Sequence, residues 1–592
     1  MMKTLPIAIE NFSDMIRKDC YYVDKTSFIK TVMEAGCKVQ LITRPRRFGK
    51  TLFMETLKSF LQIHFQKPGS TEHNASLFEG LKVSECPEFC RKYLGQYPVI
   101  FLSLKGVEGR DYAVAYRQFA EKLSMTAAPY AFLQNSPRLS DEEKTTLGNY
   151  LSKRYMKDLA HEDDCKSFLK DMTAWLSKHF ERQVVVLIDE YDVPLAKAAQ
   201  FGYYTDMLSL VRAFLGGVLK EDPQPEADAS AYLRKAVLTG CLRVSKESVF
   251  TDVNNFDVNT VCSDDRTLNE AVGFNTEEVS NLLAYYGLSS RLSDVKHWYD
   301  GYRLAGSEIY CPWDVINFAD KAIRSGNPAS FPPGNYWEGT SGNDVIEEFL
   351  GFLTADDADK MQTLVDGGSV PVTVNEKLTY RDFADHRSDD FWSLLLFTGY
   401  LTVTESAEVA GTYRVKIPNE EIRNTFDRKI KSVYSKSNRQ YARYGERLAE
   451  AFLSGDADAV RKVLMPLLRR YVSVRDEATK APPENYYHGF LSAMLVCAGD
   501  RVANLHSNAE AGNGFADLVF TSEDLTIGAV IELKRCAKPE DMPRAAQDGL
   551  EQIQAKNYVQ VFDPYQCAHC YGFSIAFSKK LCIVKAEQLS QI

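Results

Sequence analysis

The chain has 592 residues, of which 45% are hydrophobic and 25% charged, and its formal net charge is −10. This composition is ordinary for packed globular domains, and the length favours about four of them. The acidic balance excludes a uniformly cationic nucleic-acid coat protein. The sequence contains no stretch of about 18 apolar residues that could span a bilayer and no apolar secretory segment at its start. Its 13 cysteines are an odd number scattered along a long chain, which is typical of reduced thiols. We therefore expect a cytoplasmic protein without a membrane partner.

The first informative elements are a short buried strand at 39–42, a basic loop, and a helix with apolar residues at helical spacing that starts at Lys50. A Gly-Lys-Thr sequence between a strand and a helix is typical of a phosphate-binding loop. Backbone N–H groups at the helix start face the anion, Lys50 would reach the β- and γ-phosphates, and the Thr51 hydroxyl would ligate Mg²⁺. An ordinary basic helix start is the alternative.

The loop departs from the full phosphate-loop pattern at one position. Arg44 stands where that pattern has its first glycine, and an arginine cannot adopt glycine's backbone angles without cost, so the loop must differ in detail. Arg46 and Arg47 suit phosphate contact and equally suit surface ion pairs. The residues predicted to bind nucleotide here are Arg46, Arg47, Phe48, Gly49, Lys50, Thr51 and Leu52.

A second nucleotide motif ends a run of five aliphatic residues at 184–188 with the acids Asp189 and Glu190. Such a run is typical of a central parallel strand that is buried on both faces, and ligands bind at the carboxyl ends of these strands. Asp189 would hold Mg²⁺, and Glu190 would polarise the water that attacks the γ-phosphate. Any buried strand must end in polar residues, but the upstream Gly-Lys-Thr favours a nucleotide site.

A third strand is predicted at 235–240 and is followed by Arg243. Thr239, at the end of this strand, would sense the γ-phosphate. Arg243 would stabilise transferred charge, or would be a surface ion-pair partner.

Together these motifs resemble the uncharacterised bacterial AAA-ATPase-like family. The resemblance implies that an arginine at position 44 is usual and that the chain ends in a PD-(D/E)XK nuclease-like domain. It extends over most of the chain and is carried by residues 22–26, 44–51, 187–192, 238–240, 298–302, 399–402 and 417–420.

The nuclease-like motif spans two predicted strands, at 514–520 and 526–534. Because strand side chains alternate, Glu532 and Lys534 share one face, and a partner strand would place Asp517 beside them. Two carboxylates suit Mg²⁺, which could lower the pKa of a water molecule and neutralise phosphodiester charge, while Lys534 orients that water. A solvated strand face is the alternative.

Other residues near this motif follow from the resemblance. Gln552 resembles the glutamine common near such sites, and Glu484 and Glu510 both fit the family's additional acidic metal ligand. Phe515 stands where the family often has arginine, which removes a bidentate ligand for phosphate or carboxylate.

The predicted fold class is α/β, in four parts. Residues 1–270 form a P-loop NTPase domain with a parallel sheet, 271–434 a mostly helical lid or coupling domain, 435–480 a helical connector, and 481–592 the nuclease-like α/β domain. Basic and aromatic residues alternate over 423–447, which suits phosphate contact and base stacking but also fits a solvated linker. Lys462, Arg469 and Arg470 would extend such a surface.

The leading hypothesis is an ATP- and Mg²⁺-binding protein whose nucleotide cycle controls Mg²⁺-dependent cleavage of nucleic acid, with DNA and RNA both open. A role in defence or mobile-element biology rests on analogy at the level of the fold. The rival is a nucleotide-switched signalling or scaffolding ATPase whose terminal domain binds without cutting. A homo-oligomer is compatible with either.

Overall fold

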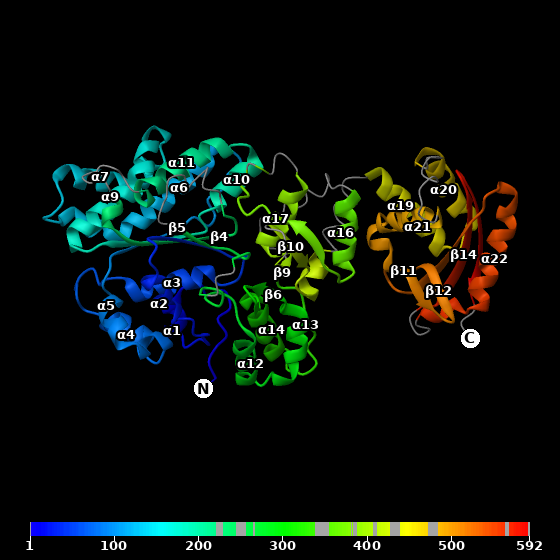
Figure 1. Cartoon of the computed structure of the whole chain (residues 1–592), viewed down its shortest axis with the longest axis horizontal. Coiled ribbons are helices and arrows are strands. Elements are labelled where there is room, and N and C mark those ends of the chain that lie inside the picture. Colours follow the sequence, from blue (N-terminus) through cyan, green and yellow to red (C-terminus); the bar gives the residue numbers. More distant parts are fainter. Residues whose placement is uncertain are drawn as a thin grey trace. The chain divides into compact units, whose positions relative to one another are not determined.

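The structure is a computed structural model that divides into two compact units, Met1–Phe426 and Asp427–Ile592 (Figure 1). None of the helices in the part of the chain that it describes combines the length and apolarity needed to cross a bilayer. The described residues are 2–220, 229–243, 256–263, 267–337, 355–380, 382, 387–406, 411–426, 439–471, 483–562 and 567–589.

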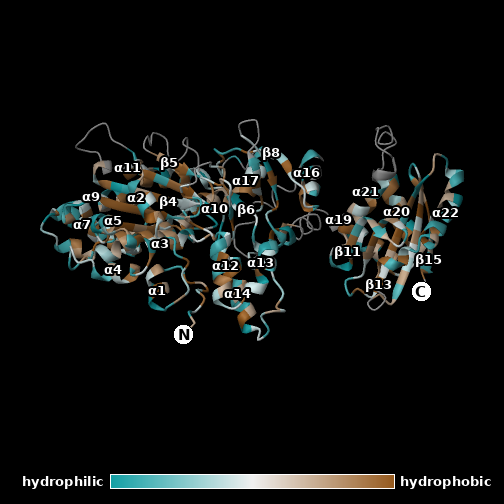
Figure 2. Cartoon of the chain, turned by 60° about the horizontal axis from the view of Figure 1, so that its bottom comes forward, coloured by the Kyte–Doolittle hydropathy of each residue, from teal (hydrophilic) through white to brown (hydrophobic). Residues whose placement is uncertain are grey.

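A five-stranded parallel sheet forms the centre of the first unit, in the order β2-β3-β4-β1-β5. Strands β1 and β3 are buried along their whole length, as their aliphatic sequences predict, and Figure 2 shows hydrophobic residues concentrated along the sheet. The strands are β1 (Val39–Thr43), β2 (Val99–Ser103), β3 (Val184–Asp189), β4 (Leu233–Gly240) and β5 (Phe256–Asn259).

Helices cover this sheet, and two of them start at the predicted nucleotide motifs. Helix α3 (Lys50–Leu61) follows the loop after β1, and α10 (Val193–Phe201) begins shortly after the acids that end β3. The others are α1 (Phe12–Arg17), α2 (Phe28–Glu34), α4 (Glu72–Phe78), α5 (Pro87–Tyr93), α6 (Tyr112–Ala127), α7 (Asp141–Leu151), α8 (Lys153–Met156), α9 (Glu162–Phe180) and α11 (Tyr204–Leu219).

The rest of the first unit, which we call the middle region (residues 267–426), is mostly helical, as predicted. Its helices are α12 (Thr276–Tyr285), α13 (Leu292–Tyr299), α14 (Pro312–Arg324), α16 (Ala355–Val365) and α17 (Ser388–Thr398). A hairpin of β6 (Tyr302–Leu304) and β7 (Ser307–Ile309) and an antiparallel sheet of β8 (Val370–Thr373), β9 (Thr402–Ser406) and β10 (Thr412–Lys416) interrupt them.

The second unit is a mixed sheet with the order β11-β12-β13-β14-β15, in which only β13 and β14 are parallel among the described pairs. The chain crosses from β13 to β14 through α22 (Met542–Ala555). The strands are β11 (Ala503–Ala511), β12 (Gly514–Thr521), β13 (Ile527–Arg535), β14 (His569–Ser578) and β15 (Leu581–Leu589).

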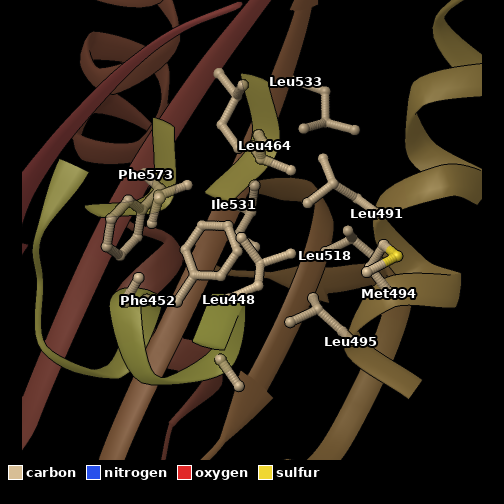
Figure 3. Packing of buried hydrophobic residues seen from close by; sticks show 14 of the residues in the cluster. Leu448, Phe452, Leu464, Leu491, Met494, Leu495, Leu518, Ile531, Leu533 and Phe573 are labelled. Carbon is tan, nitrogen blue, oxygen red and sulfur yellow. The ribbon is translucent and has the colours of Figure 1, made fainter. Parts of the chain in front are cut away.

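Three further helices pack on this sheet: α19 (Arg439–Leu453), α20 (Ala457–Tyr471) and α21 (Pro483–Val496). They share one hydrophobic core with the sheet, in which Phe452, Leu464 and Leu491 meet Leu518 and Ile531 (Figure 3). A different cluster joins α22 to the sheet. Helices α19 and α20, which we expected to form a separate connector at 435–480, are therefore part of the terminal unit.

Candidate nucleotide and nuclease-like sites

The loop between β1 and α3 holds its lysine in place with its own backbone. The Lys50 ammonium donates to the carbonyl oxygens of Arg44 and Pro45, both at 2.9 Å, and the residue is only 5% exposed. Gly49 caps the helix with a φ of 88°, a left-handed conformation that glycine adopts at little cost. The loop thus places one positive charge next to the N–H groups at the start of α3, as a phosphate-binding loop requires.

Arg44, the residue in place of the first loop glycine, has a structural role. Its guanidinium is fully buried and donates to the side-chain oxygen of Asn259 at 2.5 Å and to the backbone carbonyl of Thr43 at 2.8 Å. The positive φ angles in the loop belong to Arg47 and Gly49, so position 44 does not need glycine's backbone freedom. Arg44 ties the loop to β5.

Asp189 joins the ends of three elements. Its carboxylate is fully buried and accepts hydrogen bonds from the Thr51 hydroxyl at 2.8 Å and the Thr239 hydroxyl at 2.5 Å. The structure therefore brings together these three predicted residues, from the helix start and from β3 and β4. The Ser103 hydroxyl also donates to the Asp189 carboxylate, at 3.5 Å. A buried carboxylate with hydroxyl neighbours is a set of hard oxygen ligands that fits Mg²⁺.

Glu190 is held in an unusual conformation beside this carboxylate. Its φ is 52°, which costs energy in a residue other than glycine and is found most often at functional sites. Burial raises the pKa of Glu190 above its usual value, while the Lys50 cation opposes the shift. A carboxylate with a raised pKa is a better acceptor for the proton of an attacking water.

The second loop arginine, Arg47, faces the middle region. It donates to the carbonyl oxygen of Tyr336 at 2.8 Å, and its guanidinium lies 4.2 Å from the centre of the Trp313 ring. The next residue, Phe48, is buried and packs edge-on against Tyr302, with the ring centroids 4.9 Å apart. The loop is thereby anchored to the middle region as well as to the sheet.

A cavity of about 710 Å³ opens in front of this loop. Arg46, Lys50 and Glu190 line one part of it, together with the other loop residues through Leu52, whereas Arg243 is not part of its lining. The remaining wall is largely apolar and aromatic, and none of its residues was among the predicted site residues. It comprises residues of the N-terminal segment and of the middle region, among them Pro6, Tyr22, Val23, Phe274, Trp313 and Ile316.

Two buried acids, Asp314 and Glu421, lie behind the Arg47 anchor. Glu421 accepts hydrogen bonds from the backbone N–H groups of Tyr336 and Trp337. Burial raises the pKa of Asp314 to about 7, and burial together with the neighbouring Asp314 raises that of Glu421 to about 9. Near neutral pH the pair therefore retains a proton.

The raised pKa values of Asp314 and Glu421 predict that the folded protein loses stability as the pH rises. An unfolded carboxyl titrates near pH 4, so the folded chain binds more protons between about pH 4 and 9 and its free energy of unfolding falls across that window. In Glu421→Gln one titrating group is gone, so the apparent unfolding temperature should fall less steeply than in wild type between about pH 6 and 9. Scanning calorimetry at several pH values measures both slopes, and parallel slopes would contradict the assignment.

In the second unit, Glu532 is the centre of a polar network. One of its oxygens accepts from the Lys534 ammonium at 2.8 Å and from the Gln552 amide at 2.5 Å. Gln552 also accepts from Lys534 at 2.8 Å. These three predicted residues therefore meet, and the lysine comes from the same strand as the glutamate.

Asp517 lies at the point where β12 and β13 stop pairing, next to Glu532. Its carboxylate accepts from the backbone N–H of Leu533 at 2.6 Å, and its charge helps to raise the pKa of Glu532, although burial is the main cause. The other Glu532 oxygen is buried with no hydrogen-bond partner among the described residues. A buried carboxylate oxygen without a donor fits a metal ion, so the residues present suit Mg²⁺.

Among the described side chains, no additional acidic ligand lies near this pair. Glu510 is exposed on β11, directly across from Phe515, and no three His, Cys, Asp or Glu side chains gather as metal ligands in the described ranges. The side chain of Glu484 lies outside the described residues, as do most of the basic residues predicted over 423–447 and the side chain of Arg470.

Tyr558 completes the network and was missed from the sequence. Its hydroxyl accepts from Gln552 at 3.1 Å and donates to the backbone carbonyl of Phe515 at 2.7 Å. The contact between Gln552 and Tyr558 depends on the turn that follows α22. In the sequence, only the spacing of six residues between the two could have indicated it.

Comparisons with known proteins agree with this division into two sites. Over 499 residues the chain is 24% identical to an uncharacterized protein in the vnfD 5′ region of Azotobacter chroococcum mcd 1, covering 83% of this chain and 82% of that protein. Residues 6–250 match the family described as predicted AAA-ATPase, and residues 482–587 match the PD-(D/E)XK nuclease superfamily. The chain thus combines an AAA-ATPase-like domain with a C-terminal domain of the PD-(D/E)XK nuclease superfamily.

Proposed function

We propose that this protein binds and hydrolyses ATP in the first unit and that the nucleotide state controls a Mg²⁺-dependent nuclease-like site in the second unit. The observation that carries the proposal is the junction of Thr51, Asp189 and Thr239 behind the phosphate loop, at a cavity large enough for a nucleotide.

The two parts of the cavity match the two parts of ATP. The triphosphate would lie against the loop, where Lys50 exchanges its bonds to two carbonyl oxygens for bonds to phosphate. The base would lie in the apolar part, between the N-terminal segment and the start of α14. Trp313 is the aromatic residue best placed for base contact there, because its ring lines the cavity and is already oriented by Arg47.

Each side chain at this site would have a separate role in ATP hydrolysis. Thr51 and Asp189 would hold Mg²⁺, which neutralises phosphate charge when bound. Glu190 would accept the proton of the attacking water, a role that its raised pKa favours. Thr239 would orient the Asp189 carboxylate through its hydrogen bond.

In the second unit, Asp517 and Glu532 would hold the metal ion that activates water for attack on a phosphodiester. Lys534 would orient that water or balance developing charge, since its ammonium lies 2.8 Å from Glu532. Gln552 and Tyr558 fix the orientation of Glu532 and Lys534.

The rival function is a nucleotide-switched scaffold whose terminal domain does not cut. One buried Glu532 oxygen accepts no hydrogen bond from any residue that the structure describes. This favours the cleaving function, because burying a carboxylate in a pure binding surface would cost free energy without benefit.

Intrinsic fluorescence tests the placement of the nucleotide. ATP should change the tryptophan emission of the wild-type protein, and Trp313→Phe should lose most of this change while calorimetry still detects ATP binding. Tripolyphosphate, which has no base, should bind without the Trp313 signal, and Trp175→Phe on α9 is the matched control. An undiminished signal in Trp313→Phe would place the base elsewhere.

A further inference from the structure

The sheet of the second unit has a basic corner at the end that carries the nuclease-like site. Strands β13 and β14 are parallel, and their register brings Arg535 level with Phe577, so both strands end at this side. The turn from β14 to β15 consists of Lys579 and Lys580. The Lys580 ammonium donates to the carbonyl oxygen of Arg469 at 3.2 Å, which brings the end of α20 to the same place.

We call Arg469, Lys579 and Lys580 the basic corner. Arg469 and Lys579 are exposed, and the Tyr487 hydroxyl fixes the turn by donating to the Lys579 carbonyl at 2.7 Å. The chain as a whole has a net charge of −10, so three cations at one end of a sheet form a locally basic region. Such a cluster fits the phosphate backbone of a nucleic acid.

Phe515 lies at the same end of the sheet, at the start of β12. It is 65% exposed, an unusual position for a phenyl ring on an interior strand. Because side chains alternate along a strand, Phe515 shares its side of β12 with Asp517, two residues further along.

The nuclease-like residues lie between the basic corner and Phe515. The sheet order places β13, with Glu532 and Lys534, between β12 and β14. With strands about 4.8 Å apart, the turn after β14 lies roughly 10–15 Å across the sheet from the start of β12. A few nucleotides of an extended single strand can cover this distance.

We propose that the terminal domain takes single-stranded nucleic acid, with phosphates on the basic corner, the scissile phosphate at Asp517 and Glu532, and an unpaired base stacked on Phe515. The proposal rests on the proposed function of that domain. The exposed Glu510, directly across from Phe515, repels phosphate and leaves the ring to contact a base. An unpaired strand fits best, because paired and stacked bases do not expose their faces to a protein ring.

The basic corner is tested by the salt dependence of binding. Fluorescence anisotropy with the full-length protein, without divalent ions, would use labelled oligonucleotides of about 12 nucleotides as single-stranded DNA, single-stranded RNA and duplex. The double variant Lys579→Gln/Lys580→Gln should bind single strands more weakly and lower the slope of log K against log salt by about 1.4, or about 0.7 for each lost phosphate contact. Arg501→Gln removes one charge at the other end of the sheet and should leave the slope unchanged.

The stacking contact is tested by removing either the ring or the bases. Phe515→Ala should weaken binding of single strands about tenfold, and Phe515→Trp should restore it. On an abasic oligonucleotide wild type and Phe515→Ala should bind equally, because there is no base to stack. The DNA and RNA probes show which single strand is preferred.

Failure of this inference differs from failure of the proposed function. If wild type cleaves and Glu532→Gln does not, but the corner and ring variants bind like Arg501→Gln, the inference is wrong and the function stands. A preference for duplex that is insensitive to Phe515→Ala would also overturn it. A wild-type protein that neither binds nor cleaves any probe would overturn both.

Discussion

Replacing Lys50 by alanine should abolish ATP turnover, with a loss of about 10²- to 10³-fold, the size expected for one preorganised charged donor. The ammonium is held over the loop by two carbonyl oxygens at 2.9 Å, so its charge is already in place before phosphate arrives. Phosphate release by the purified full-length protein measures the effect, and calorimetry should show weakened ATP binding in the same variant.

Two other variants separate this effect from misfolding. Lys58→Ala removes a partly exposed lysine from the same helix, outside the lining of the nucleotide cavity, and should keep wild-type turnover. Glu190→Gln should bind ATP yet lose hydrolysis, because only the proton acceptor is changed. ATP turnover that survives in both Lys50→Ala and Glu190→Gln would locate hydrolysis elsewhere.

Replacing Glu532 by glutamine should remove metal-dependent cleavage of nucleic acid, by about 10²- to 10⁴-fold, as expected when a metal ligand is lost. The amide keeps the size of the carboxyl group and can still meet Lys534 and Gln552 through its oxygen. The domain should therefore remain folded, which circular dichroism and an unchanged unfolding temperature would verify.

Glu551→Gln is the matched control for this prediction, because Glu551 is exposed on α22 next to Gln552. It removes the same charge without touching the network and should cleave like wild type. Equal cleavage by Glu532→Gln and wild type would show that the nuclease activity comes from a contaminant or from another site.

The sequence predicted the polar site residues at the ends of strands and helices better than the residues that line the cavity around them. Asp189 and Thr239 lie at the ends of parallel strands and Thr51 at the start of the helix after β1, where topology alone brings side chains together, and the structure joins them. The proximity of Asp517, Glu532 and Lys534 could be predicted in a similar way. Side chains alternate along a strand, and β12 pairs with β13. These are contacts between elements that have short, recognisable patterns.

The parts that sequence analysis missed depend on contacts between distant segments. Strand β5 and the Asn259 side chain that holds Arg44 have no local motif, so the role of that arginine was visible only in the fold. Trp313 reaches the nucleotide cavity through the packing of α14, more than 250 positions after the loop that it contacts. Glu510 satisfied the sequence pattern of a metal ligand, yet its strand places it across from Phe515.

Asp192, three residues after Asp189, links the end of β3 to the middle region. It accepts from the backbone N–H groups of Cys241 and Leu242, both at 2.9 Å, and from the Tyr380 hydroxyl of the middle region at 3.1 Å. The segment that follows β3 is therefore tied to a tyrosine almost two hundred positions away in the sequence. One short acidic segment thus contacts the start of α3 and the end of β4 through Asp189, and the middle region through Asp192.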